Sequence, residues 1–140
     1  MPYSLRIAQW TTDQAHLRVV REQVFVIEQK VPRELEWDDE DARCTHVLAL
    51  SSNGTPIGTG RLLNDGHIGR MAVLRSWRRH GVATAILLML MELARKAGHK
   101  QARLHAQSYV VPLYEHHGFE VEGEEFDEVG IPHRYMRCYF

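Results

Sequence analysis

The amino-acid sequence predicts an α+β fold, a mixed three-layer arrangement in which a central mixed sheet of about seven strands is flanked by helices. Tight turns at Asn53-Gly54 and Asn64–Gly66 separate three strand-like segments, which predicts an antiparallel meander. A long apolar segment then stands between the third of these and one further strand-like segment, and a helix in that position is the usual connection between parallel strands. These elements fit one domain over residues 1–140, which is long enough to bury a sizeable core.

The N-terminal segments predict a strand, a helix and an acidic loop. Residues 4–9 form the strand, and Thr11 is expected to cap the helix because Gln14 follows at capping-box spacing. Apolar residues that recur at helical spacing should face the core; they are Leu17, Val20, Val24 and Ile27. Polar residues between them should form the solvated face; they are Arg18, Arg21, Glu22 and Gln23. The helix ends at Lys-Val-Pro, residues 30–32, and the acidic segment 33–43 follows.

The remaining segments complete the predicted sheet. Strands are expected at residues 45–51, 55–63, 67–73, 103–107, 118–121 and 133–139, with an acidic connection before the last one. The long helix after Gly81 ends at Gly98, a favourable C-cap, and Ser108 is expected to cap a short helix through about His116. The residues of the long helix that should face the core are Val82, Ile86, Met89, Leu90, Leu93 and Ala97, and its polar strip is Thr84, Glu92 and Arg95. Strands 67–73 and 103–107 should pair in parallel and leave a cleft at their C-terminal ends.

The polar loop that opens the long helix indicates an anion-binding site. Gly81 and Ala83 are small, so a ligand can approach the first N–H groups of the helix, which have no partner inside it. Arg78 and Arg79 can add charge-assisted hydrogen bonds to a pyrophosphate. The loop matches neither G-x-x-x-x-G-K-[ST] nor G-x-G-x-x-G, which disfavours nucleoside triphosphates and dinucleotides. An ordinary strand–helix connection with surface arginines is the alternative interpretation.

The loop and four other segments resemble a known family. Met71-Ala72-Val73, then Arg78, Gly81 and Ala83, are similar to the acyl-coenzyme A motif of GNAT N-acyltransferases. Segments 28–36, 104–107, 114–119 and 130–133 resemble a branch of small GNAT acetyltransferases, with E-Q-K-V-P and Y-E-H-H-G-F among them. The resemblance implies a GNAT-type fold in which the strand backbone binds pantetheine and the loop amides hold the pyrophosphate. The positions implied to bind the acyl-CoA are Met71, Ala72, Val73, Arg78, Arg79, His80, Gly81, Val82, Ala83, Thr84 and Ser108. Ser108 departs from the asparagine that many relatives carry there.

The reaction that the resemblance implies is acetyl transfer from acetyl-CoA to a primary amine, by direct attack in a ternary complex. The Met71 amide is implied to stabilise the oxyanion, and Tyr114 occupies the position of the family's general acid. On the acceptor side, Glu36 or Asp38 could hold an ammonium group, although a solvated acidic loop explains them equally well. His46, His105 and His133 are candidates for the base that deprotonates the amine.

Two other classes of function stay open at this stage. A non-catalytic acyl-CoA sensor or protein-interaction module would use the same fold, but the loop and Tyr114 are intact. An unrelated phosphate-binding protein, such as a nucleotide hydrolase, would need a Walker lysine and a metal-ligand cluster that the sequence lacks.

Composition limits the partners. The chain has 17 Lys and Arg against 18 Asp and Glu, a net charge of −1, so no nucleic-acid partner is expected. Cys44 and Cys138 form neither a disulfide framework nor a zinc site, and no metal is expected. The apolar run is interrupted by Glu92 and Arg95, so no membrane span is expected and a cytoplasmic protein is predicted. The sequence leaves both a monomer and a homodimer open.

Overall fold

A computed structural model describes residues 2–140, whose strands form one seven-stranded mixed sheet in the order β1-β2-β3-β4-β5-β7-β6. The strands are β1 (Tyr3–Ala8), β2 (Thr45–Ser51), β3 (Pro56–Leu62), β4 (His67–Val73), β5 (Gln101–Gln107), β6 (Glu120–Glu128) and β7 (Ile131–Tyr139). Neighbouring strands are antiparallel except β4 and β5, which are parallel. The predicted fold class, the meander and the parallel crossover are therefore confirmed.

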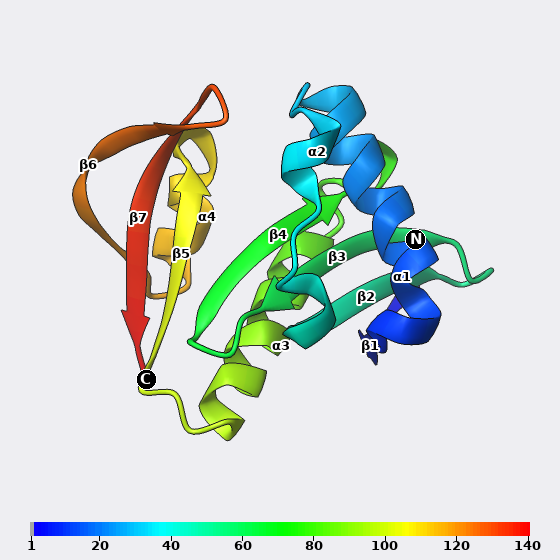
Figure 1. The fold of residues 1–140 in the computed structure, drawn as a ribbon. Helices are drawn as coiled ribbons and strands as arrows, with labels where there is room; N and C mark the ends of the chain where they lie inside the picture. The colour runs from blue at the N-terminus through cyan, green and yellow to red at the C-terminus, as the bar shows by residue number, and fades with distance from the viewer. Residues whose placement is uncertain (1) are drawn as a thin grey trace.

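Helices cover both faces of the sheet, as Figure 1 shows. The α-helices are α1 (Trp10–Arg21), α2 (Arg33–Glu36), α3 (Val82–Lys96) and α4 (Val111–His116). Short helical turns of other types are η1 (Glu22–Glu28), η2 (Asp41–Arg43), η3 (Arg75–Trp77) and η4 (Ser108–Val110). In Figure 1, α1 and α2 lie on one face of strands β2 to β4, whereas α3 lies on the other.

The start of α1 differs from the prediction that Thr11 caps it. The helix begins at Trp10 with Gln9 as its N-cap, and no side chain caps it there. The backbone N–H of Gln9 instead donates to Asp13 Oδ2 at 2.8 Å, and Arg6 binds both oxygens of the same carboxylate. A carboxylate within the first turn complements the positive end of the helix dipole, which favours a helix that begins two residues earlier than predicted.

The end of α1 explains two wrong predictions about which side chains face the core. Leu17, Val20 and Val24 are buried as predicted, but Ile27 is 48% exposed. After Arg21 the chain continues as the π-helix η1, in which the N–H of Gln29 bonds to the carbonyl of Val24 five residues earlier. The wider turn breaks the 3.6-residue period, so Ile27 rotates toward solvent. Arg21, predicted on the solvated face, is 1% exposed because it binds two buried carboxylates described below.

Helix α3 packs directly on β3. A Cβ atom at Gly60 would lie 2.8 Å from side-chain atoms of Ile86 and Leu90, so glycine lets the helix approach the strand closely. The buried residues of α3 are Val82, Ile86, Leu87, Leu90, Met91 and Ala94. The predicted inward residues Met89 and Leu93 are only half-buried and Ala97 is exposed, since the apolar sequence made the exact facing of this helix ambiguous. Gly98 follows the C-cap Ala97 with φ +90° and closes the predicted C-terminus.

The C-terminal segments form a longer hairpin than predicted. Residues 122–128 belong to β6 rather than to an acidic connection, and β7 begins at Ile131. A register shift between Glu122 and Phe126, with Gly123 at φ +74°, interrupts β6 and hides its alternation. Ser108 does not cap a helix; its hydroxyl donates to Glu125 at 2.8 Å.

Strands β4 and β5 separate after a short parallel contact. Only two pairs join them, His67 with Arg103 and Ile68 with Leu104. Beyond these pairs, from Gly69 to Val73, the edge of β4 that faces β5 has no partner strand within residues 2–140. Figure 1 shows the two halves of the sheet diverging there. This divergence opens the cleft that the sequence predicts.

Candidate active site

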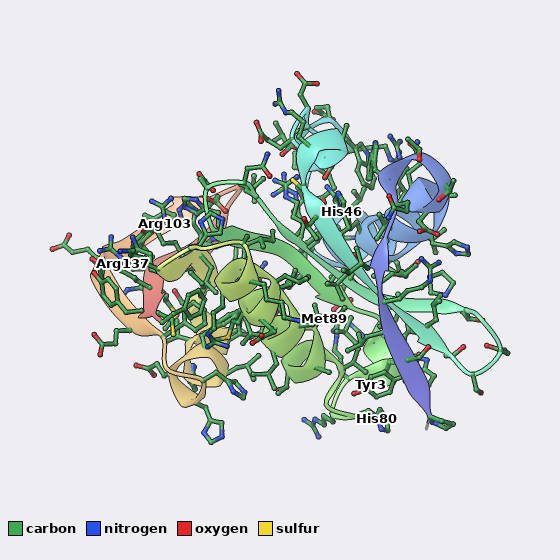
Figure 2. All side chains as sticks on the ribbon, turned by 90° about the horizontal axis from the view of Figure 1, so that it is seen from below. Tyr3, His46, His80, Met89, Arg103 and Arg137 are labelled. Carbon is green, nitrogen blue, oxygen red and sulfur yellow. The ribbon has the colours of Figure 1, made fainter. Side chains whose placement is uncertain are left out.

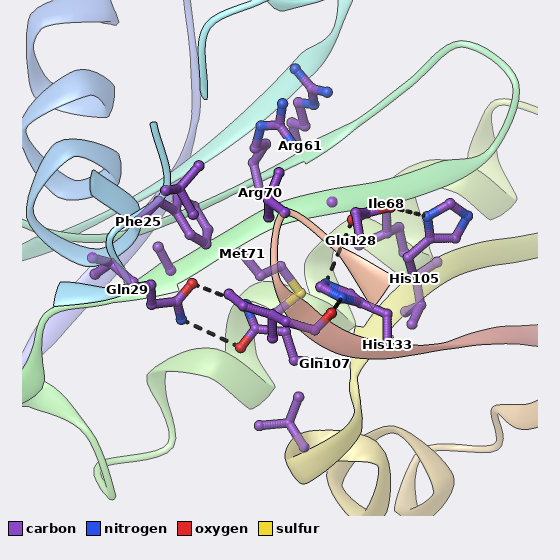
Figure 3. Close-up of a pocket in the computed structure, with 18 of the residues that line it drawn as sticks. Phe25, Gln29, Arg61, Ile68, Arg70, Met71, His105, Gln107, Glu128 and His133 are labelled. Carbon is purple, nitrogen blue, oxygen red and sulfur yellow. Dashed lines mark hydrogen bonds and ion pairs between the residues drawn. The ribbon is translucent and has the colours of Figure 1, made fainter. Parts of the chain in front are cut away.

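The cleft between β4 and β5 contains a cavity of about 800 Å³. Its walls come from the exposed edge of β4, the end of β5, η1, α4 and the β6–β7 turn. Five of the predicted acyl-CoA positions line it, namely Met71, Ala72, Val73, Arg78 and Ala83. Figure 3 shows the cavity with Met71 between Gln107 on one side and His133 on the other.

A β-bulge shapes the β4 wall. Thr59 pairs with Ala72 and Arg61 pairs with Gly69, so β4 has one residue more than β3 over this stretch. Arg70 lies in the bulge with φ +48°, an uncommon conformation for a residue with a side chain. The bulge bends β4 at the point where it leaves β5, and the backbone of residues 69–73 remains open to a ligand.

A second cavity of about 230 Å³ lies at the start of α3. Its lining residues include Arg78, Arg79, Gly81, Val82, Ala83 and Thr84, all of them predicted acyl-CoA positions. Gly81 is the N-cap with φ +78°, and no side chain caps the helix. The amides of the first turn therefore stay available to an anion. Val73, Arg78 and Ala83 line both cavities, so the pockets adjoin.

Arg78 is held at the junction of the two cavities. Its Nε donates to the Val73 carbonyl at 3.0 Å, and its terminal nitrogens each donate to Glu28 at 2.7 Å.

His80 and Ser108, two other predicted acyl-CoA positions, line neither cavity. The ring of His80 packs against Trp77, and Figure 2 shows it near Tyr3 at the start of α3.

Tyr114 lies in the wall of the larger cavity. Its side chain is buried, its ring packs edge-on against Phe119, and its hydroxyl donates to Met71 Sδ at 3.7 Å. A thioether is a weak acceptor, so the hydroxyl retains most of its capacity to donate to a ligand. Burial, with a smaller effect of Tyr109, raises the pKa of Tyr114 to about 12. The phenol is therefore protonated at physiological pH.

Glu36 and Asp38 line the cavity but belong to a largely buried ion network with Arg21, Arg61 and Arg70, in which Asp38 and Arg70 are partly exposed. Glu36 Oε2 lies 2.8 Å from Arg21 and 3.3 Å from Arg70. Asp38 accepts two hydrogen bonds of 2.9 Å from Arg61 and one of 3.3 Å from Arg70. Asp41 completes the network through Arg21 and Arg61. The acidic segment is thus mostly compensated by arginines, which differs from a solvated loop.

The three candidate histidines separate into two places. His46 lies outside the cavity, stacked on Trp10 and bonded through Nε2 to the Asp41 carbonyl at 2.7 Å. Figure 2 shows it on the side of the sheet opposite α3. His105 and His133 both line the cavity and meet at Glu128, whose carboxylate lies 2.9 Å from His105 Nδ1 and 3.6 Å from His133 Nε2.

Glu128 and the pair Gln29–Gln107 are site residues that sequence reasoning missed. The two glutamine amides bond reciprocally at 3.0 and 3.4 Å, and so link η1 to the end of β5 across the cleft, as Figure 3 shows. Glu128 was hidden among the other acidic residues of 122–128. Phe126 stands two residues before Glu128, and this spacing is the one sequence signal that could have placed both side chains on the same face of a strand.

An open cleft between two diverging parallel strands, with free helix amides at one end, has the shape and the donors to take an elongated ligand that carries an anionic group. The family model of the acetyltransferase (GNAT) domain matches residues 10–140. The chain therefore belongs to the GNAT acetyltransferase family and is an acyltransferase. It is 40% identical over 121 residues to the uncharacterized N-acetyltransferase YjcF of Bacillus subtilis, an alignment that covers 84% of this chain and 86% of that one.

Solved structures agree with this assignment. An acyl-CoA N-acyltransferase from Pseudomonas aeruginosa superposes with a TM-score of 0.87 at 25% identity, covering 98% of this chain and 99% of the other. ElaA of Escherichia coli has the same fold, with a TM-score of 0.87 at 23% identity and the same coverage. Over residues 2–140 no helix is long and apolar enough to cross a membrane, and no group of three or more potential metal ligands occurs.

Proposed function

We propose that the protein transfers the acetyl group of acetyl-CoA to a primary amine by direct attack within a ternary complex. The observation that carries this proposal is the position of Tyr114. Its buried, protonated hydroxyl lies in the cleft with only a thioether sulfur as its partner among residues 2–140, and that cleft adjoins the free amides of α3. A thioester placed between these features would have its sulfur near a hydrogen-bond donor.

In this proposal, residues of the two cavities hold three parts of the acyl-CoA: the pyrophosphate, the pantetheine arm and the thioester. The first-turn amides of α3, with Arg78 and Arg79, would hold the pyrophosphate. The unpaired edge of β4 from Gly69 to Val73 would bind the pantetheine amides as a neighbouring strand would. The Met71 amide would stabilise the oxyanion formed when the amine attacks the carbonyl carbon. His80 and Ser108 would at most contact the carrier at the rims of these pockets.

Atoms and protons balance in the proposed reaction as follows. The ammonium form of the amine loses one proton, its nitrogen then forms a bond to the carbonyl carbon, and the C–S bond breaks. The nitrogen loses a second proton, which ends on the coenzyme sulfur. A phenol with a pKa of about 12 is a weaker acid than a thiol with a pKa of about 8.5, so Tyr114 cannot simply surrender its proton to the thiolate. We therefore assign Tyr114 the role of a relay. Its hydroxyl donates a hydrogen bond to the departing sulfur, and as its proton passes to that sulfur it takes up the second proton of the amine nitrogen.

Glu36 and Asp38 are given a different role from the ammonium contact that the sequence suggests. Because each is already bound by arginines, we propose that they hold Arg61 and Arg70 in the cavity wall. Burial raises the pKa of Glu36 against the opposing charges of Arg70 and Arg21, whereas Arg61 brings the pKa of Asp38 below its ordinary value despite burial.

The test is a panel of primary amines with acetyl-CoA, in which thiol release and the mass of the acetylated product are both measured. The panel should contain alkyl monoamines, polyamines, amino acids and peptide N-termini, with a reaction without amine as the control. We expect amine-dependent thiol release and a matching acetylated product. Acetyl-CoA binding without turnover of any amine would instead favour a non-catalytic acyl-CoA sensor.

A further inference from the structure

One carboxylate of the larger cavity is not bound to an arginine. Glu36 and Asp38 belong to the buried ion network, and Asp65 has Arg103 at 3.7 Å. Glu128, which also lines this cavity, is paired within residues 2–140 only with the two histidines. When those rings are neutral, its negative charge is the part of the cavity wall that is free to attract a cation.

The ring of His133 is fixed so that one nitrogen faces this carboxylate. Its Nδ1 lies 2.7 Å from the Ile131 carbonyl, and because a carbonyl only accepts, Nδ1 must carry the hydrogen. In the neutral ring Nε2 then presents a lone pair, 3.6 Å from Glu128 Oε2. The ring is 7% exposed and stacks on Phe126, so the surrounding packing holds this orientation.

A lone pair and a carboxylate that face each other need a donor between them. The neutral imidazole and the ionised carboxylate are both acceptors there, so the arrangement is favourable when the ring is protonated, or when a water or a ligand supplies O–H or N–H groups. An alkylammonium group supplies three. Figure 3 shows Glu128 directed toward both imidazole rings at the side of the cavity away from Gln29.

We propose that Glu128 and His133 form the acceptor subsite, an inference that rests on the proposed acetyl transfer. Glu128 binds the ammonium group of a cationic primary amine, and His133 Nε2 removes one proton from it as the general base. The neutral amine then attacks the thioester, and the imidazolium returns its proton to solvent through Glu128, whose side chain is 42% exposed.

His105 is a positioning residue in this subsite. It bonds to the other carboxylate oxygen of Glu128 at 2.9 Å, with its side chain 40% exposed. The same cavity is also lined by His67, whose ring lies 5.9 Å from that of His105, and by Arg70 of β4, which is paired with Glu36 and Asp38. Any of these groups could cause a loss of rate at low pH. The test therefore needs a readout besides the pH dependence of the rate.

The experiment compares the wild type with His133→Gln, Glu128→Gln and the control His16→Gln, which changes an exposed histidine on α1. Initial rates are measured at saturating acetyl-CoA with two nucleophiles: the best alkylamine of the panel, and hydroxylamine, which is largely neutral at neutral pH and needs no base. For His133→Gln we expect a loss of about 10²–10⁴-fold in kcat with the alkylamine and a much smaller loss with hydroxylamine. Glu128→Gln should raise the KM for the alkylamine, and His16→Gln should behave as the wild type.

Equal losses with both nucleophiles, or wild-type rates for His133→Gln with the alkylamine, would overturn the inference. If His133→Gln does not fold, Glu128→Gln decides, because its side chain is partly exposed; an unchanged alkylamine KM would then reject the subsite. A wild-type protein that releases no thiol with any amine would reject the proposed acetyl transfer itself. The two failures are therefore distinguishable.

Discussion

Tyr114 is the residue whose proposed role can be isolated most cleanly, because one atom carries it. Replacing Tyr114 by Phe keeps the ring that packs against Phe119 and removes only the hydroxyl, whose one bond within residues 2–140 is to the Met71 sulfur. A positioned proton donor contributes about 10²–10⁴-fold, and a thiolate is already a tolerable leaving group, so we expect kcat to fall about 10²-fold. The affinity for acetyl-CoA and the thermal unfolding temperature should change little.

Single-turnover rates, calorimetric binding and thermal unfolding check this prediction. Because the pKa of Tyr114 is about 12, ionisation of this residue should cause no loss of rate as the pH rises from neutral to about 10. A variant that reaches the wild-type rate when chemistry is rate-limiting would remove Tyr114 from the reaction. A large loss of stability would mean that the hydroxyl is needed for the fold.

Residues with a local sequence signal were predictable, and residues defined by long-range partners were not. Tyr114, Gly81 and Arg78 belong to compact motifs, and all three line or adjoin the cavities. Arg21 has the spacing of a solvated residue, yet it is buried because Glu36 and Asp41 reach it from 15 and 20 residues away. Arg70 lies in a bulge at positive φ that no side-chain pattern marks.

At the scale of elements, the start of α3 is the feature that most directly determines acyl-CoA binding. Gly81→Asp would place a negative charge beside the free amides where the pyrophosphate is proposed to bind. Space is open there, since the nearest atom to an added Cβ is the Tyr3 hydroxyl at 3.9 Å, and aspartate adopts positive φ more readily than most residues. We expect a severe loss of acetyl-CoA affinity in a folded protein.

A matched control separates charge from backbone strain. Gly54, in the β2–β3 turn, has φ +84° and open surroundings, so Gly54→Asp carries a similar backbone cost far from the cavities. Calorimetric titration with acetyl-CoA should show wild-type affinity for Gly54→Asp. If Gly81→Asp also binds normally, the phosphate-loop assignment is wrong.

Element types were easier to predict than the way each element faces. The strands of the meander and the helix after Gly81 follow from turn residues and hydrophobic runs, because these signals are local. The predictions of which residues of η1 and α3 face inward were partly wrong, because the periodic signal is lost in both. In η1 the hydrogen bonds change to a spacing of five residues, and α3 is nearly all apolar. The bulged strand β6 was mistaken for a connection for the same reason.

The whole molecule combines an open cleft with a buried ion network on the side of α1 and α2. Arg21, Arg61 and Arg70 face Glu36, Asp38 and Asp41, so the formal charges of the network balance. Removing one partner of a buried pair leaves an uncompensated charge and is far more costly than the pair is stabilising. The network therefore fixes α1, the acidic segment and β4 relative to one another, and with them one wall of the cleft.

His46, bonded to the Asp41 carbonyl beside this network, is expected to make the stability of the whole fold depend on pH. Burial lowers its pKa below the ordinary 6.5, and Arg21 and Arg61 act in the same direction against the bond to Asp41. Below about pH 6.5 the unfolded chain therefore binds more protons at this residue than the folded one. The free energy of unfolding should fall as the pH is lowered from about 6.5 toward 5.

His46→Gln isolates this contribution, because glutamine can still donate to the Asp41 carbonyl but does not titrate. Urea unfolding of both proteins should show a steeper loss of stability for the wild type between about pH 6.5 and 5, and a flatter profile for the variant. The lowered pKa values of Asp13, Asp38 and Asp41 change the free energy of unfolding at more acidic pH, below their ordinary 3.8. The raised pKa of Glu36 changes it with the opposite sign, and does so equally in the wild type and the variant. Parallel profiles for the two proteins would show that His46 is protonated equally in the folded and unfolded states, and that the network tolerates its charge.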